Sequence, residues 1–107
     1  MRPSSYVMLL VTAKDNKEAK KIANTLLKSK LVACVNIIDG IQSLFWWQGK
    51  IDQSKEVLLV LKTQKNLFNK VSSQVKSLHS YQNPEIIALP IVAGSRDYLK
   101  WISESVR

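Results

Sequence analysis

The sequence predicts an α+β fold in which two helices cover one face of a four-stranded sheet. Four apolar runs typical of strands are combined with two segments whose apolar residues recur at helical spacing. In chain order these elements read strand, helix, strand, strand, helix, strand, and a short helix follows. This is the order of the split βαβ, or ferredoxin-like, arrangement. Because right-handed crossovers place both main helices on the same face, the opposite face of the sheet is predicted to be open.

The first strand is predicted at Tyr6–Val11 and the first helix at Asp15–Lys30. Asp15 and Glu18 stand three positions apart, which is the spacing of a capping box at a helix start. One apolar stripe then recurs at helical spacing: Ala19, Ile22, Ala23, Leu26 and Leu27. The stripe predicts a helix that packs one face on the sheet.

The second and third strands are predicted to form a hairpin that turns at Gln48–Lys50. Its apolar runs are Leu31–Ile38, Ile41–Trp47 and Val57–Leu61. Asp39–Gly40, between the first two runs, suits a kink or a tight turn. The third run barely alternates between apolar and polar residues, so both faces of that strand are predicted to be buried.

The second half of the chain begins with Thr63, which we expect to cap the second helix. Asn83–Pro84 breaks any continuation of that helix. A fourth strand is predicted at Glu85–Val92, at an edge of the sheet because Pro90 cannot donate to a ladder. Gly94–Ser95 then starts the short terminal helix. The apolar face of the second helix consists of Leu67, Phe68, Val71, Val75 and Leu78.

The composition indicates a single domain spanning residues 1–107, because the chain has 107 residues and is 46% hydrophobic. No apolar run approaches the length of a membrane-spanning helix, and no signal peptide is expected. The single cysteine excludes an internal disulfide and fits a reducing compartment. We therefore expect a cytoplasmic location.

The net charge of +8 is compatible with a nucleic acid, a membrane surface or an anionic small molecule as a partner. The lysines of the first helix mostly avoid its apolar stripe, however, which favours a solvated helix face. Trp46 and Trp47 could stack on RNA bases, but the glycine-flanked aromatic pattern of RNA-binding sheets is absent. We therefore expect neither a nucleic acid nor a membrane as a partner.

The open face of the sheet is predicted to be apolar, because all four strands carry apolar residues on both sides. Burial of roughly ten such side chains, at ~1.5–3 kcal/mol each, would contribute a favourable free energy on the order of 20 kcal/mol. A monomer rarely leaves so large an apolar patch bare. The sequence therefore predicts an obligate oligomer that packs through this face and the hairpin end, with Phe45, Trp46, Trp47 and Val60 in the interface.

Five segments resemble, in the same order along the chain, the motifs of the CutA family of divalent-cation tolerance proteins: Leu31–Ile37, Trp47–Ile51, Leu61–Thr63, His79–Pro90 and Tyr98–Trp101. The resemblance covers nearly the whole chain. It implies a ferredoxin-like protomer in a tight homotrimer, similar in assembly to the PII signal-transduction proteins. It also implies a cytoplasmic role in tolerance of copper and other divalent metals, without a defined catalytic mechanism.

Cys34 is the only thiol and His79 the only imidazole, and such a soft ligand set could hold copper or another divalent metal. No paired cysteine or histidine motif accompanies them, so one chain cannot assemble a standard zinc or copper site. A trimer would bring several copies together. The alternative is that Cys34 is a small buried hydrophobe and that His79 ends the second helix.

Lys62, Tyr81 and Glu85 are the candidates for a ligand pocket between subunits, because a cation, a phenol and a carboxylate stand near the predicted sheet. The alternative is that Glu85 forms a structural ion pair with a lysine such as Lys62. The loop from His79 to Glu85 could also carry acid–base chemistry, but no catalytic motif accompanies it and we do not expect an enzyme.

Three hypotheses follow for the function. The first is a homotrimeric divalent-cation tolerance or signalling protein that binds a metal or a small ligand between its subunits. The second is a trimeric scaffold for a protein partner. The third is an enzyme that uses the loop from His79 to Glu85.

Overall fold

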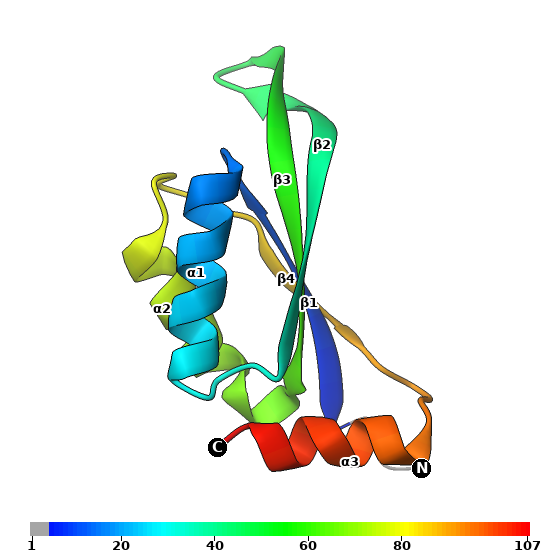
Figure 1. The fold of residues 1–107 in the computed structure, drawn as a ribbon. Helices are drawn as coiled ribbons and strands as arrows, with labels where there is room; N and C mark the ends of the chain where they lie inside the picture. The colour runs from blue at the N-terminus through cyan, green and yellow to red at the C-terminus, as the bar shows by residue number, and fades with distance from the viewer. Residues whose placement is uncertain (1–4) are drawn as a thin grey trace.

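The computed structural model describes residues 5–107. Its four strands form one antiparallel sheet in the order β2-β3-β1-β4. Helices α1 and α2 lie side by side on one face, and α3 crosses one end of the sheet (Figure 1). This confirms the predicted ferredoxin-like order. The elements are β1 (Tyr6–Ala13), α1 (Asn16–Lys28), β2 (Cys34–Trp47), β3 (Lys50–Gln64), the 3-10 helix η1 (Lys65–Leu67), α2 (Phe68–Leu78), β4 (Ile86–Pro90) and α3 (Arg96–Ser105).

Helix α1 begins where the capping signal predicted it. The Asp15 side chain accepts a hydrogen bond of 2.9 Å from the backbone N–H of Glu18, which satisfies one of the free donors at the helix start. Of the predicted apolar stripe, Ala19, Ile22 and Leu26 are fully buried against the sheet, whereas Leu27 is exposed. Helix α3 is capped in the same way, because Ser95 accepts from the N–H of Tyr98.

Strands β2 and β3 form a long two-stranded arm that extends beyond the other two strands (Figure 1). Gln48 and Gly49 join them with φ angles of 50° and 77°, the left-handed pair that suits a tight hairpin turn. Asp39–Gly40 does not turn the chain. It forms a bulge inside β2, where Gly40 has a φ of 74° and the pairing register shifts between Ile38 and Ile41.

The prediction that Thr63 caps the second helix is wrong. Thr63 lies inside β3, opposite Val7 of β1, and its hydroxyl donates to the carbonyl oxygen of Leu31 at 2.6 Å. Helix α2 follows η1, and Leu67 at its start provides no side-chain cap. The long-range pairing with β1 extends the strand past a residue whose local preference is for a cap.

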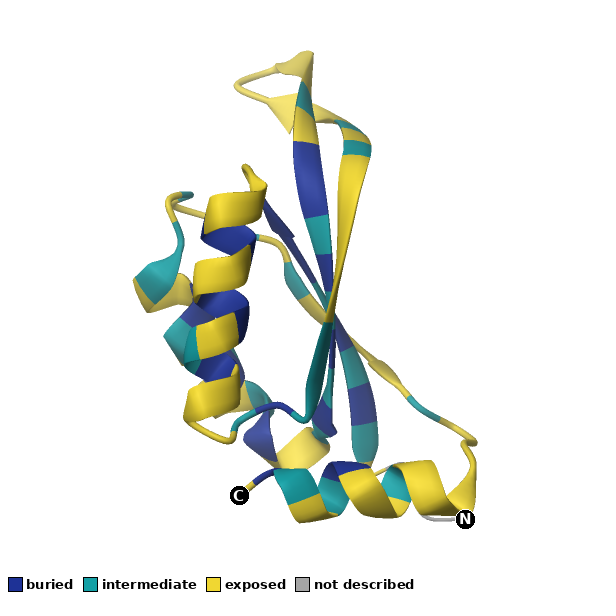
Figure 2. Ribbon diagram, in the orientation of Figure 1, coloured by how far each residue is buried: buried dark blue, intermediate teal, exposed yellow. Residues whose placement is uncertain are grey.

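Buried residues alternate with half-buried ones along β3 (Figure 2), so the two faces of the sheet differ in burial. On the helix side, Leu9 and Leu59 are fully buried. On the open side, Val60 is half-buried and Ile87 and Leu89 are exposed. The second face of the run at 57–61 is therefore only partly covered within one chain. Strand β4 is an edge strand, as predicted, but it is shorter than the predicted range and ends at Pro90.

Candidate functional site

The loop after α2 packs a polar cluster onto the end of β1. His79 ends the helix, and its side chain has 0% exposure. Its Nε2 lies 2.7 Å from the carbonyl oxygen of Thr12, which can only accept, so this nitrogen carries the proton. Its Nδ1 accepts the backbone N–H of Tyr81 at 3.0 Å. Both ring nitrogens are therefore engaged.

Glu18 fastens the same loop to α1. Its Oε2 accepts the backbone N–H of Ser80 at 2.9 Å, and its Oε1 accepts the backbone N–H of Lys14 at 3.2 Å. Oε1 also lies 3.9 Å from Nδ1 of His79. Burial acts to raise the pKa of Glu18, but the hydrogen bonds from Ser80 and Lys14 outweigh it and hold the pKa below its ordinary value.

Tyr81 connects the loop to the hairpin arm. Its hydroxyl donates to Oε2 of Glu56 at 3.0 Å, and its ring lies 4.7 Å from that of His79 between centroids. Burial, followed by the hydrogen bond to Glu56 and the nearby charges of Glu56 and Glu18, raises the pKa of Tyr81 to about 12. At neutral pH the phenol is a hydrogen-bond donor, and it is not an available base.

A second polar cluster lies towards the other end of the open face. Cys34 of β2 pairs with Lys62 of β3, and the Lys62 ammonium donates to the Asn36 side chain. The Cys34 sulfur lies 3.9 Å from Oδ1 of Asn36. Tyr98 of α3 is the fourth member, because it lies beside the Cys34 thiol. Burial, followed by this thiol, raises the pKa of the Tyr98 phenol.

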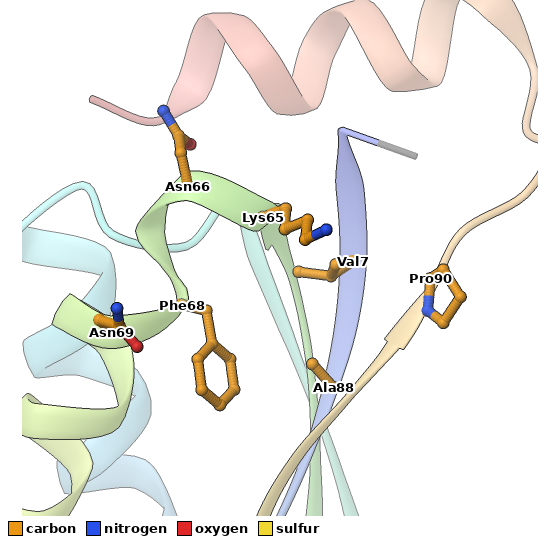
Figure 3. Close-up of a pocket in the computed structure, with 7 residues that line it drawn as sticks. All are labelled: Val7, Lys65, Asn66, Phe68, Asn69, Ala88 and Pro90. Atoms are coloured by element: carbon orange, nitrogen blue, oxygen red, sulfur yellow. The ribbon is translucent and has the colours of Figure 1, made fainter. Parts of the chain in front are cut away.

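A hollow of about 830 Å³ opens between β4 and the start of α2. Phe68 from α2 and Ala88 from β4 line it from two sides (Figure 3). The complete lining is Val7, Lys65, Asn66, Phe68, Asn69, Ala88 and Pro90. None of the site residues predicted from the sequence contributes to it.

The model of the family described as CutA1 divalent ion tolerance protein matches residues 7–105. The chain belongs to the CutA1 family.

Other CutA1 members resemble it in both sequence and structure. It is 43% identical over 98 residues to the divalent-cation tolerance protein CutA of Thermus thermophilus, covering 92% of this chain and 95% of that protein. A solved Thermus thermophilus structure matches with a TM-score of 0.94 and 41% identity, covering 95% of this chain and 99% of the other. The chloroplastic CutA 1 of Oryza sativa is 41% identical over 101 residues. That match includes 94% of this chain but only 57% of the rice protein.

Within one CutA1 chain, the two candidate metal ligands lie apart. His79 bonds to Thr12, whereas Cys34 pairs with Lys62, which in turn pairs with Met8. Thr12 and Met8 are four positions apart in β1, which corresponds to about 13 Å along the strand. In residues 5–107, no group of three or more His, Cys, Asp or Glu side chains is arranged to hold a metal ion.

The candidate cleft residues are also spread along the sheet. Lys62 pairs with Met8 of β1. Glu85 is exposed and directly precedes Ile86, which pairs with Val11, three positions further along β1. Within the described part of the chain these two residues form no ion pair. Tyr81 reaches neither of them and contacts Glu56 instead.

Two residues of the loop cluster were missed by the sequence analysis. Glu18 was recognised only as part of a capping box, and Glu56 was not considered. The carboxylate of Glu18 bonds to residue 14 and, across the fold, to residue 80. The only local signal was the spacing from Asp15, and no spacing in the sequence predicts the contact between Glu56 and Tyr81.

Proposed function

We propose that this CutA1 member functions as a homotrimer that binds a divalent cation or a small ligand in the clefts between its subunits. The observation that carries the proposal is the uncovered apolar surface of the single chain. On the open sheet face, Ile38, Ile87 and Leu89 remain exposed. On the arm, Trp46 and Trp47 are 74% and 53% exposed.

The arm supports assembly because, within residues 5–107, its end has no partner strand beyond the β2–β3 pair (Figure 1). A face of one subunit that binds a different face of the next forms a closed ring when the rotation closes. Burying each large apolar side chain contributes about 1.5–3 kcal/mol. An arm laid on a neighbouring subunit, together with the open sheet face, supplies this burial for several side chains at once.

The proposed clefts lie where the open face meets a neighbouring subunit. Lys62 offers a cation and Tyr81 a phenol at different ends of the face, and Glu85 offers an exposed carboxylate. Within one chain these groups are apart, so a ligand that contacts all three needs groups from two subunits. Such a cleft suits a small polar ligand with both donors and acceptors.

A divalent cation would have to be shared between subunits as well. His79 would lose one of its two hydrogen bonds to become a ligand, while Cys34 is half-buried and offers one thiol per chain. A metal in this protein would therefore be held by Cys34 groups and others contributed by more than one subunit. The buried and fully bonded His79 also supports a binding role over acid–base catalysis.

The location of the protein stays a prediction. In residues 5–107, no helix is both long and apolar enough to cross a membrane. A relative named chloroplastic occurs in rice, so family membership alone does not assign the compartment. The cytoplasmic location predicted from the sequence rests on the lone cysteine together with the expectation of no signal peptide and no membrane-spanning run.

Two measurements test the proposal. Sedimentation equilibrium of the purified chain is expected to give three times the monomer mass, and a monomer in dilute solution would overturn it. Calorimetric titration of the trimer with copper is expected to show stoichiometric binding that weakens in Cys34→Ser. A trimer that binds no copper would remove the cation from the proposal, and a screen with small polar ligands would then test the cleft through loss of binding in Lys62→Ala.

A further inference from the structure

The positive charge of this chain is concentrated on its helical layer. We define the basic layer as residues 14–30 and 65–78, which comprise α1, η1, α2 and their flanks. It carries nine lysines and two carboxylates, and therefore +7 of the net charge of +8. The nine lysines are all exposed: Lys14, Lys17, Lys20, Lys21, Lys28, Lys30, Lys65, Lys70 and Lys76.

Neither carboxylate of the basic layer neutralises these lysines. Asp15 caps α1, and Glu18 is buried and accepts from two backbone N–H groups. In residues 5–107, the only ion pair is between His79 and Glu18, so no lysine lies within 4.0 Å of a carboxylate. Lys17 and Lys21 also stand at the i, i+4 spacing at which like charges destabilise a helix. The fold thus maintains an uncompensated positive surface.

The lysines are interspersed with neutral hydrogen-bond donors. A shallow hollow of about 440 Å³ on this layer is lined by Leu31, Asn69, Lys70, Ser73 and Gln74. It contains no carboxylate. Lysine, asparagine, serine and glutamine side chains are the groups that contact phosphate and sugar in protein–nucleic acid complexes.

We propose that the basic layer binds the phosphate backbone of double-stranded nucleic acid without reading its sequence. The one aromatic side chain of the layer, Phe68, is half-buried and lines the hollow beside β4, so the layer presents no exposed ring on which unpaired bases would stack. This assignment departs from two expectations, that the lysines only solvate helix faces and that no nucleic acid is a partner, because the structure brings the lysines of both helices onto one layer.

The layer is poorly suited to a membrane surface. An interfacial helix inserts its apolar face among the lipids, but the apolar stripes of α1 and α2 are buried against the sheet, as Ile22 and Val75 show. Leu27, which is 38% exposed, is the only exposed large hydrophobic side chain of this layer. Attraction to phosphates on a rigid duplex needs no apolar insertion.

Fluorescence anisotropy with a labelled DNA duplex of about two helical turns tests the proposal on the full-length chain. With about four phosphate contacts, the affinity is expected to fall about 100-fold between 50 and 200 mM salt. The triple variant Lys17→Glu, Lys21→Glu, Lys70→Glu is expected to bind ~10-fold or more weakly. The slope of log affinity against log salt concentration is expected to become shallower by about three, one for each lysine replaced.

The matched control is Arg96→Glu, Lys100→Glu, Arg107→Glu, which changes the net charge equally at exposed positions outside both the basic layer and the arm. It is expected to keep most of the affinity, and circular dichroism checks that both triple variants are folded. Equal losses in the two variants would overturn the proposal, as would absence of duplex binding at 50 mM salt. Binding to vesicles of phosphatidylserine and phosphatidylcholine without binding to the duplex would assign the layer to a membrane instead.

Discussion

The backbone N–H of Ser80 donates a hydrogen bond of 2.9 Å to the carboxylate of Glu18, 62 positions earlier in the chain. This bond fastens the loop after α2 to the first turn of α1. Because the same carboxylate also accepts the N–H of Lys14, a single buried side chain joins the end of β1, the start of α1 and the loop. The position of His79 and Tyr81 therefore depends on Glu18.

Replacement of Glu18 is expected to destabilise the fold. Glu18→Ala leaves the N–H groups of Lys14 and Ser80 without their acceptor, and we expect a loss of about 1–3 kcal/mol in the free energy of unfolding. Urea denaturation at neutral pH measures it. Glu104→Ala, at an exposed position on α3, is the control and is expected to leave the stability unchanged.

The same carboxylate makes the stability sensitive to acid. Because its pKa in the folded protein lies below the ordinary value of 4.5, the charged form stabilises the fold above that value. This contribution is lost as the pH falls through the lowered pKa. We expect the unfolding free energy of the wild type to decrease below about pH 5, and to decrease less steeply in Glu18→Gln. Identical pH profiles for the two proteins would contradict the assignment.

Tyr81 is expected to titrate separately from an ordinary tyrosine. The burial of the phenol, followed by its hydrogen bond to Glu56, raises its pKa to about 12. Ultraviolet absorbance during alkaline titration is expected to show a late phenolate step that is missing in Tyr81→Phe. That variant also leaves the Glu56 carboxylate without this donor, and we expect it to lose about 1 kcal/mol in stability.

The turn of the arm is expected to tolerate glycine in place of Gln48 but not alanine in place of Gly49. Gly49 has a φ of 77° and no atom near its missing Cβ, so Gly49→Ala costs only backbone strain, about 1–2 kcal/mol. Gln48 already bears such strain with a φ of 50°. Gln48→Gly is therefore expected to be neutral within about 0.5 kcal/mol, because relief of strain is offset by greater freedom of the unfolded chain. Thermal denaturation compares the two variants.

The arm and the open face are expected to hold the oligomer together. Trp47→Asp and Val60→Asp each place a charge in an interface that we propose to be dry, and both are expected to sediment as monomers. Val92→Asp is the control, because Val92 is exposed but lies outside the sheet and the arm. Sedimentation of either interface variant at the wild-type mass would contradict the proposed surface.

Local patterns were sufficient for much of the fold. The capping spacing of Asp15 and the stripe from Ala19 onwards predicted α1, and Pro90 predicted an edge strand. The order of these elements then allowed only a few topologies. The failure at Thr63 shows the limit, because pairing between β3 and β1 outweighed its tendency to cap a helix.

The sequence by itself determined the elements, their order and the apolar character of both faces of the sheet, because each is encoded in residues a few positions apart. Only the tertiary structure decided that Glu18 holds the loop after α2, that both nitrogens of His79 are engaged, and that the lysines of two helices form one layer. These relationships join residues distant in the chain. They arise from the crossover of the helices and the register of the strands, and no local spacing records them.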